Sequence, residues 1–299
     1  MRVIVARDYD EMSKKAAEIV ADRIRSFKPS KKKPYFVLGL ATGKTPIGTY
    51  QELVRLHKAG RLDFSKVMTF NLDEYLLLDP DHPQSYHLFM YENLFNHINI
   101  KKANVNVPNG MARDFEKFCQ DYEKKINKYG GIDLQVLGIG GDGHIAFNEP
   151  GSSLASRTRV KTLNLQTVHD NYKLFFEEAD FEITDVPVFA LTMGVGTIME
   201  SKEALLLASG ERKAGVVAKA IEGPVTSEIT ASKLQDHPSA TAILDEGAAA
   251  KLKKRPYYNQ AVRGEEEFKK IQDLLKGGGS IDEARILQKK FLEKIMREW

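Results

Sequence analysis

Short, continuous apolar runs recur along the chain and are separated by polar or amphipathic stretches. Each run is rich in Val, Leu and Ile, a composition typical of strands that are buried on both faces of a sheet. We predict strands at these runs, which are Val3–Ala6, Tyr35–Leu40, Val67–Leu72, Asp133–Ile139, Val186–Met193, Ala204–Ser209 and Ala240–Leu244.

Amphipathic stretches fill most of the intervals between the runs. In the first interval, apolar residues recur at helical spacing from Met12 to Ile24, which indicates one buried helix face. Strands that alternate with helices are typical of a doubly wound α/β fold. We therefore expect a Rossmann-like, mostly parallel sheet with helices on both faces, the helices being Tyr9–Phe27, Pro46–Lys58, Gln84–Ile98, Phe115–Tyr129 and Arg212–Ile221.

The end of the chain has a different composition. After Tyr258 charged residues dominate, and two amphipathic stretches, Gly264–Leu275 and Ile281–Trp299, flank the flexible break Gly277–Ser280. We predict a main domain over residues 1–258 and a helical extension over 259–299. Two interpretations stay open for the extension: it packs on the core or on a neighbouring subunit, or it is an independent binding module.

Composition narrows the classes of protein that this chain can be. The 44 Lys and Arg residues nearly balance the 41 Asp and Glu residues, so nothing indicates the basic face that nucleic-acid binding needs. No apolar stretch reaches the roughly 18 residues of a membrane span, and the chain begins without a signal-peptide pattern. We expect a cytoplasmic protein whose single cysteine, Cys119, is an inert packing thiol.

Candidate chemistry follows the strands, because ligands of an open α/β sheet bind beyond the carboxyl ends of its strands. The run that ends at Leu40 leads into ATGKTP, a loop of small and hydroxyl residues before a helix start, which suits an anion. A nucleoside-triphosphate loop would need glycine at Leu38. The sequence therefore predicts a phosphate site without a nucleotide, with candidate ligands Thr42, Gly43, Lys44 and Thr45.

A second strand, Val67–Leu72, runs directly into Asp73-Glu74-Tyr75. Adjacent carboxylates at a strand end can be solvated loop residues. They can also be held near the sheet and serve as bases. The sequence leaves both interpretations open for Asp73.

The third strand end carries GIGGDGHIAFNEP. Its glycines match the dinucleotide pattern in spacing, but Asn148–Gly151 closes any helix after them, so we do not expect NAD. What remains is a glycine-rich loop with Asp142, His144 and Glu149, a set able to transfer protons. A metal site is the rival interpretation, but no further His or Cys lies nearby. We expect neither a metal nor a cofactor.

The motifs FNLDEY, GIGGDGHIAFNEP and SSLASRTRVKTL closely resemble the glucosamine-6-phosphate deaminase (isomerase) family, in order from about Met1 to Pro256. ATGKTP resembles the family's phosphate loop, which commonly has glycine where Lys44 stands. The resemblance implies a catalytic domain that converts glucosamine 6-phosphate and water to fructose 6-phosphate and ammonium. It implies an amino-sugar-phosphate deaminase and isomerase, classed with the hydrolases.

Roles for individual residues also come from this resemblance. It implies that Asp73 is the base that moves the C2 proton and that His144 opens the sugar ring, with Asp142 and Glu149 as its supporting carboxylates. It adds Lys213 to the phosphate ligands. The family has an arginine before paired phenylalanines, where this chain has Lys173 before Leu174-Phe175-Phe176; lysine loses the two-pronged contact, which puts the role of Lys173 in doubt.

A regulatory site is a further expectation from the resemblance. Some family members bind N-acetylglucosamine 6-phosphate as an activator at a subunit interface of a hexamer, so we expect a homo-oligomer, for which a hexamer is one option. The alternative is that the basic residues are one solvated face of a short strand. The matching positions are Ser152, Arg159, Lys161 and Thr162.

Two rival functions share the expected architecture. One is a 6-phosphogluconolactonase-like hydrolase, which opens a sugar-phosphate lactone. The other is a non-catalytic sugar-phosphate sensor. The FNLDEY and HIAFNEP motifs favour the deaminase, because only deamination needs the base at Asp73.

Overall fold

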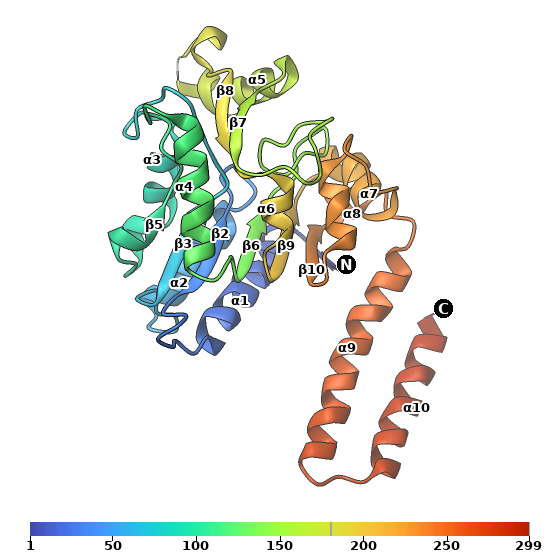
Figure 1. The fold of residues 1–299 in the computed structure, drawn as a ribbon. Coiled ribbons are helices and arrows are strands. Elements are labelled where there is room, and N and C mark those ends of the chain that lie inside the picture. Colours follow the sequence, from blue (N-terminus) through green and yellow to red (C-terminus); the bar gives the residue numbers. More distant parts are fainter. Residues whose placement is uncertain (180, 299) are drawn as a thin grey trace.

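The computed structural model describes residues 1–179 and 181–298. Its centre is a seven-stranded sheet in the order β1-β10-β9-β6-β2-β3-β5, in which every neighbouring pair is parallel (Figure 1). The strands are β1 (Arg2–Ala6), β2 (Phe36–Leu40), β3 (Val67–Asn71), β5 (Val105–Asn106), β6 (Leu134–Leu137), β9 (Glu203–Ala208) and β10 (Ala240–Asp245).

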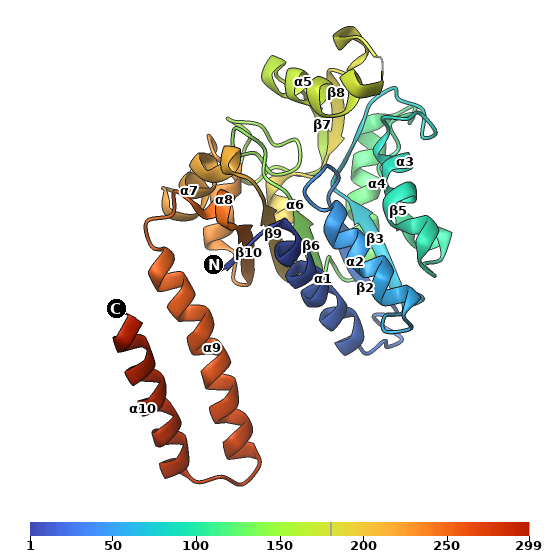
Figure 2. The same cartoon turned by 180° about the vertical axis from the view of Figure 1, so that it is seen from behind.

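Side chains that alternate along these strands enter two separate cores. In β2, Leu38 packs in the core beneath α1 (Tyr9–Ser26), α2 (Ile47–Lys58) and α3 (Tyr86–Asn93), the face turned to the reader in Figure 2. Its neighbour Val37 enters the core on the other face. That face is covered by α4 (Phe115–Lys128), α6 (Val195–Met199), α7 (Ala214–Glu222) and α8 (Glu246–Ala249). The prediction of a doubly wound sheet is confirmed.

A second sheet departs from the prediction. It has three antiparallel strands in the order β4-β8-β7, namely β4 (Asp73–Tyr75), β8 (Phe189–Thr192) and β7 (Arg159–Thr162). The run Val186–Met193 was predicted in the parallel sheet, and that was wrong. Its apolar character has another cause, because Ala190 and Val186 pack with Tyr75 and Phe176 in a small core of their own.

The predicted helices match the structure except near the third. The stretch Gln84–Ile98 is interrupted, because α3 ends at Asn93 and a 3-10 turn follows at Phe95–His97. The helix α5 (Leu165–Asn171), the short helices α6 and α8 and several short turns were not predicted. These turns are Lys102–Asn104, Tyr172–Phe176, Glu177–Ala179, Ile183–Asp185, Glu211–Lys213 and Thr230–Asp236.

The C-terminal residues form a helical hairpin, α9 (Arg255–Lys276) and α10 (Ile281–Glu298), that extends away from the sheets (Figure 1). The helix α9 begins at Arg255 rather than at Gly264, because Pro256 is well suited to a first helical turn. Its first half contacts β1, with an ion pair of 2.5 Å between Arg2 and Glu265. The predicted helix end at Trp299 lies outside the described residues.

In the described part of the chain, no helix combines the length and the apolar character that crossing a bilayer requires. Cys119 is buried against Leu76 and Leu191, and burial raises the pKa of its thiol to about 11. A thiol with that pKa stays protonated near neutral pH, as expected for a packing residue.

Candidate active site

A cavity of about 260 Å³ opens beyond the carboxyl ends of β2 and β6. These two adjacent strands are the switch point of the sheet, because β3 and β5 lie on one side of them and β9, β10 and β1 on the other. Ligands of doubly wound sheets bind at this position. The cavity wall contains seven of the predicted site residues, Thr42, Gly43, Lys44, Thr45, Asp73, His144 and Lys213.

The loop after β2 is shaped for an anion. Gly43 has a φ of +109°, a conformation that residues with a side chain rarely adopt. Two tyrosines fix the loop: Tyr50 donates to the carbonyl oxygen of Ala41 at 2.5 Å, and Tyr9 donates to that of Lys44 at 3.1 Å. Because α2 begins at Ile47, its free amides and positive end also favour an anion here.

Lys213 reaches the same cavity from the turn after β9. Its ammonium donates to the carbonyl oxygen of Ile139 at 2.8 Å. Burial lowers the pKa of Lys213, although the charges of Asp170 and Asp142 act in the opposite direction. An anion in the cavity would restore the pKa by stabilising the ammonium form. The position therefore suits a phosphate ligand.

Asp73 lies where the chain crosses from the large sheet to the small one. The N–H of Leu72 donates to Leu40 in the large sheet, and its carbonyl oxygen accepts from Met193 beside the small sheet. Only 6% of Asp73 is exposed. Burial and the charge of Glu74 raise the pKa of Asp73 to about 8, against a smaller opposing contribution from the Thr42 hydroxyl. A carboxylate with that pKa is a strong base for its type.

Glu74 is a residue that the sequence did not single out. Its carboxylate accepts the backbone N–H groups of Tyr75, Tyr86 and His87 at 2.8–3.0 Å, and thereby ties β4 to the first turn of α3. Burial raises its pKa to about 7 despite these three donors. These hydrogen bonds hold Tyr86 in the cavity wall, which also contains Asp73.

His144 is held by Asp142 and by a close approach of the backbone. Its Nδ1 lies 2.7 Å from Oδ1 of Asp142. Although burial opposes it, the contact with His144 lowers the pKa of Asp142, so this carboxyl remains charged. The imidazole lies over Gly140, where an added Cβ would be 2.4 Å from the ring. Nε2 is therefore the ring nitrogen left for chemistry.

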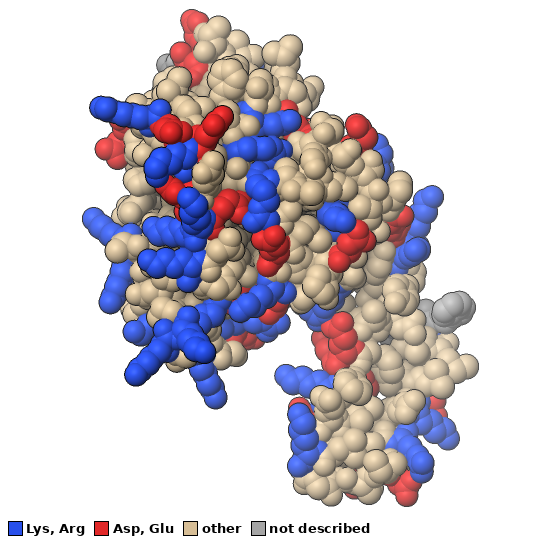
Figure 3. All heavy atoms as spheres, in the orientation of Figure 1, with Lys and Arg blue, Asp and Glu red and all other residues tan. Residues whose placement is uncertain are grey.

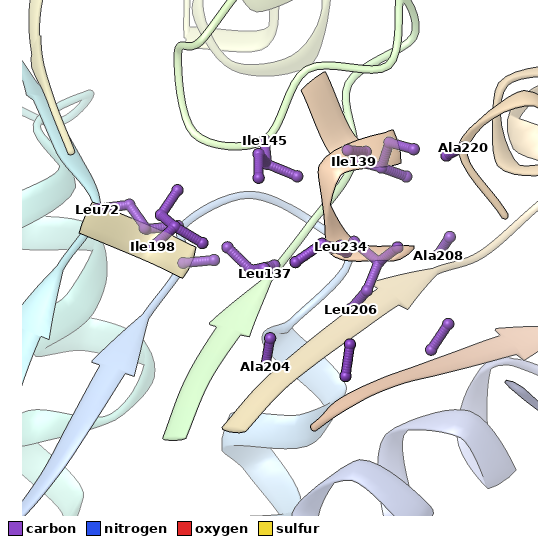
Figure 4. Packing of buried hydrophobic residues seen from close by; sticks show 14 of the residues in the cluster. Leu72, Leu137, Ile139, Ile145, Ile198, Ala204, Leu206, Ala208, Ala220 and Leu234 are labelled. Carbon is purple, nitrogen blue, oxygen red and sulfur yellow. The ribbon is translucent and has the colours of Figure 1, made fainter. Parts of the chain in front are cut away.

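The glycine-rich loop is anchored in the core on both sides of the imidazole. Ile139 and Ile145 are buried and point toward the ends of the strands, above Leu137 and Leu206 (Figure 4). Ala146, which lines the cavity, has a positive φ of 50°. Such a conformation is costly for a residue with a Cβ and is common at functional sites.

Glu149 is placed differently from Asp142. Both of its carboxylate oxygens accept the N–H of Asn164, at 2.8 and 3.0 Å, and Asn164 caps α5. The structure thus connects Glu149 to α5, which contributes Thr167 and Asn171 to the cavity wall. Support of the His144 imidazole by Glu149 stays a prediction.

Lys173 is the predicted phosphate ligand that the structure leaves outside the cavity. It is exposed, and its ammonium lies 2.5 Å from the carboxylate of Glu177. The side chains of Leu174 and Phe175, which the family motif involves, lie outside the described residues. In this structure Lys213 is therefore nearer to the anion loop than Lys173 is.

The four regulatory candidates lie on and near β7 and stay a prediction. Ser152 is buried, and Arg159 donates to Oδ1 of Asn148 at 2.9 Å. Arg159 and Lys161 share the half-buried face of β7, whereas Thr162 lies on its exposed face. Burial lowers the pKa of Arg159. The alternative of one solvated basic face therefore does not describe Arg159 and Lys161, which lie on the less exposed face.

Asn171 is a second residue that sequence reasoning missed. It lines the cavity and is buried, and its side chain lies within hydrogen-bond reach of the Tyr75 hydroxyl. A side-chain amide at this position can also donate to a ligand hydroxyl. Asn171 lies in a helical stretch without a recognisable motif. Its possible role in ligand binding is therefore evident only from its position beside the cavity.

A metal centre finds little support in the side chains. Within residues 1–179 and 181–298, no group of three or more His, Cys, Asp or Glu residues could hold a metal ion. That the protein needs no metal stays a prediction.

Comparison with known proteins gives a consistent result. A family model described as glucosamine-6-phosphate isomerases/6-phosphogluconolactonase matches residues 7–244. A glucosamine-6-phosphate deaminase of Thermoanaerobacter pseudethanolicus is 53% identical over 250 residues, which are 84% of this chain and 94% of the relative. A solved monomeric glucosamine-6-phosphate deaminase of the NagB superfamily is 46% identical, with a TM-score of 0.78 over 84% of this chain and all of that one.

A more distant structure shares only the fold. A 6-phosphogluconolactonase from Trypanosoma cruzi is 22% identical, with a TM-score of 0.65 over 84% of this chain and 97% of that one. The hairpin of α9 and α10 lies beyond the residues that the family model matches.

Proposed function

The chain belongs to the family of glucosamine-6-phosphate isomerases and 6-phosphogluconolactonases, and from this membership we propose that it deaminates glucosamine 6-phosphate to fructose 6-phosphate and ammonium. One observation carries the proposal beyond the relatives' names. A desolvated carboxylate, Asp73, shares one cavity with an anion loop and a histidine. Each of the three groups has a task in this reaction.

His144 is suited to opening the sugar ring. Because Asp142 lies at Nδ1, Nε2 is free to take the proton from the C1 hydroxyl while a proton is returned to the ring oxygen. Asp142 also stabilises the imidazolium that forms during this transfer. The rigid loop between Ile139 and Ile145 keeps the ring in place.

Asp73 is suited to the carbon-acid step. In the open-chain sugar the C2 proton is weakly acidic, and a carboxylate held out of water removes it more readily than a solvated one. The same group then returns a proton at C1, which leaves an iminium at C2. Water adds to this carbon and ammonium leaves, so that C2 becomes the carbonyl of fructose 6-phosphate. The pKa of Asp73, about 8, keeps this group able to accept and to donate a proton near neutral pH.

The phosphate fits the opposite part of the cavity. Thr42, Gly43 and Thr45, the first turn of α2 and Lys213 together supply amides, hydroxyls and a cation. Lys44 adds a second positive charge to this loop. We propose a lesser part for Lys173, which stays at the surface with Glu177.

Finer expectations remain proposals. The family description names isomerases, so the comparisons do not support the expected hydrolase class. Activation by N-acetylglucosamine 6-phosphate at Ser152, Arg159, Lys161 and Thr162, and assembly into a homo-oligomer such as a hexamer, stay proposals that rest on the resemblance to the family. Because sugar phosphates are metabolites of the cytoplasm, we propose that the enzyme acts there, with residues 1–258 as its catalytic domain.

The test is a product assay with glucosamine 6-phosphate. Ammonium release and fructose 6-phosphate should appear in equal amounts, and Asp73→Asn should abolish exchange of the C2 proton with solvent while binding remains measurable. Hydrolysis of 6-phosphogluconolactone without ammonium release would instead favour the lactonase. Binding without turnover of either compound would favour the sensor.

A further inference from the structure

The hairpin of α9 and α10 carries exposed apolar residues that neither the sheets nor the other helix covers. Its inner seam is formed by small and apolar residues, among them Gly264 and Phe291, which meet across the two helices. A different set lies outside this seam. Its members, all more than one third exposed, are Tyr257, Phe268 and Leu275 in α9 and Ile281, Leu292 and Met296 in α10.

These six residues lie on the same side of the hairpin. The seam is marked by the less exposed residues, which are Gly264, Glu267, Ile271 and Leu274 in α9 and Ala284, Leu287, Phe291 and Ile295 in α10. With 100° per residue, the exposed α9 residues point roughly 60–80° away from the mean direction of that seam, and the exposed α10 residues roughly 75–135°. Because the helices are antiparallel, these rotations bring both sets to one broad face. Figure 3 shows the hairpin with uncharged atoms along its middle and Lys and Arg at its edges.

We propose that this apolar face binds the same face of a second copy of the chain, so that two hairpins form a four-helix bundle. Water-exposed apolar faces of this extent on paired helices are typical of interaction surfaces. A second copy is the occupant that the geometry favours, because the face is complementary to itself.

The self-complementarity follows from the register. Gly264 lies opposite Phe291, so Phe268 is level with about residue 287. A two-fold axis across the helices at this level sets Phe268 beside its own copy. The same axis places Ile281 of one copy near Leu292 of the other, since these residues lie about six and about five residues from it. Such an isologous contact closes as a dimer.

The size of the face is sufficient for a dimer. Each helix is roughly 30 Å long at 1.5 Å per residue, and two helices side by side are about 20 Å wide. The two copies together would cover about 1,200 Å², the lower end of the range for specific interfaces. The axis also places the sheets of the second copy beyond the loop that joins α9 and α10 of the first. Figure 1 shows no other part of the chain there, so the two copies do not collide.

The full-length protein should therefore sediment as a species of about 67 kDa, twice 33.7 kDa, at concentrations on the order of 100 µM. The double variant Phe268→Lys with Leu292→Lys places two charges on this face. It should sediment as a monomer, with the same turnover per chain as the wild type. The matched control is Ile286→Lys, because Ile286 is exposed and points about 120° away from Leu292 around α10. This variant should remain dimeric.

A disulfide between two copies of residue 268 tests the position of the two-fold axis. The cysteine of Phe268→Cys should form a disulfide with its own copy under mild oxidation, since Cys119 is buried and does not compete. The cysteine of Ile286→Cys should not. A wild-type protein that stays monomeric, equal dissociation by Ile286→Lys, or a larger assembly that survives both lysines would each overturn the proposal.

Discussion

Replacing Asp73 by asparagine should stabilise the fold while it destroys the activity. Asp73 is nearly inaccessible to water, and the groups that act on its pKa are the charge of Glu74 and the hydroxyl of Thr42. Burial and the neighbouring charge of Glu74 raise its pKa from the ordinary 3.8 to about 8. Keeping this carboxylate charged in the folded protein therefore costs free energy that the neutral amide of asparagine does not cost.

The magnitude follows from proton linkage. Below pH 3.8 the folded and unfolded chains both hold the proton, and Asp73 adds no pH dependence. As the pH rises, the unfolded chain releases its proton first, so the free energy of unfolding falls until the folded state also ionises near pH 8. At about 1.36 kcal/mol per pH unit, the loss between pH 5 and pH 8 is about 4 kcal/mol.

The assay is urea denaturation of the wild type and Asp73→Asn at pH 5 and at pH 8. The stability difference between the two proteins should move in favour of the variant by several kcal/mol at the higher pH. Asp142→Asn is the control, because the pKa of Asp142 is lowered and its carboxyl is charged in both states at either pH. A stability difference for Asp73→Asn that is the same at both pH values would refute the reasoning.

Three further predictions concern catalysis. Gly140→Ala should lower kcat/KM by about 100-fold, because the new Cβ would lie 2.4 Å from the His144 ring; Gly215→Ala, whose Cβ meets only Lys251 at 3.9 Å, should not change it. Lys213→Gln should weaken binding of fructose 6-phosphate by at least about tenfold in calorimetry, whereas Lys173→Gln should change it by less than about threefold. The kcat/KM should fall as the pH drops below about 8, because the base must be a carboxylate, and Glu74→Gln should move this limb to lower pH by about one unit.

The layers of the fold were predictable from the sequence, because a strand that is buried on both faces is an uninterrupted apolar run. Val67–Leu72 and Ala240–Leu244 are apolar without alternation, and both lie inside the large sheet. The run Val186–Met193 has the same pattern for a different reason, since it belongs to a second, smaller core. A one-dimensional pattern reports burial and does not report which core provides it.

The candidate site was predictable where a motif follows a strand and was missed where contacts are distant in sequence. Asp73 comes directly after β3 and Leu72, and His144 lies in the loop that follows β6, so position and chemistry coincide. The helices that carry Asn171 and Tyr86 are held by contacts from Asn164 to Glu149 and from Tyr86 to Glu74. Those tertiary contacts leave no local signal in the chain.

The crossing of the chain at Leu72 has a mechanical consequence. One residue joins the two sheets, and Asp73 comes directly after it. Because the backbone of Leu72 is hydrogen-bonded to Leu40 on one side and to Met193 on the other, the carboxylate is held where the two sheets meet. A change in the packing of either sheet would therefore reach the base directly, even when it begins far from the cavity.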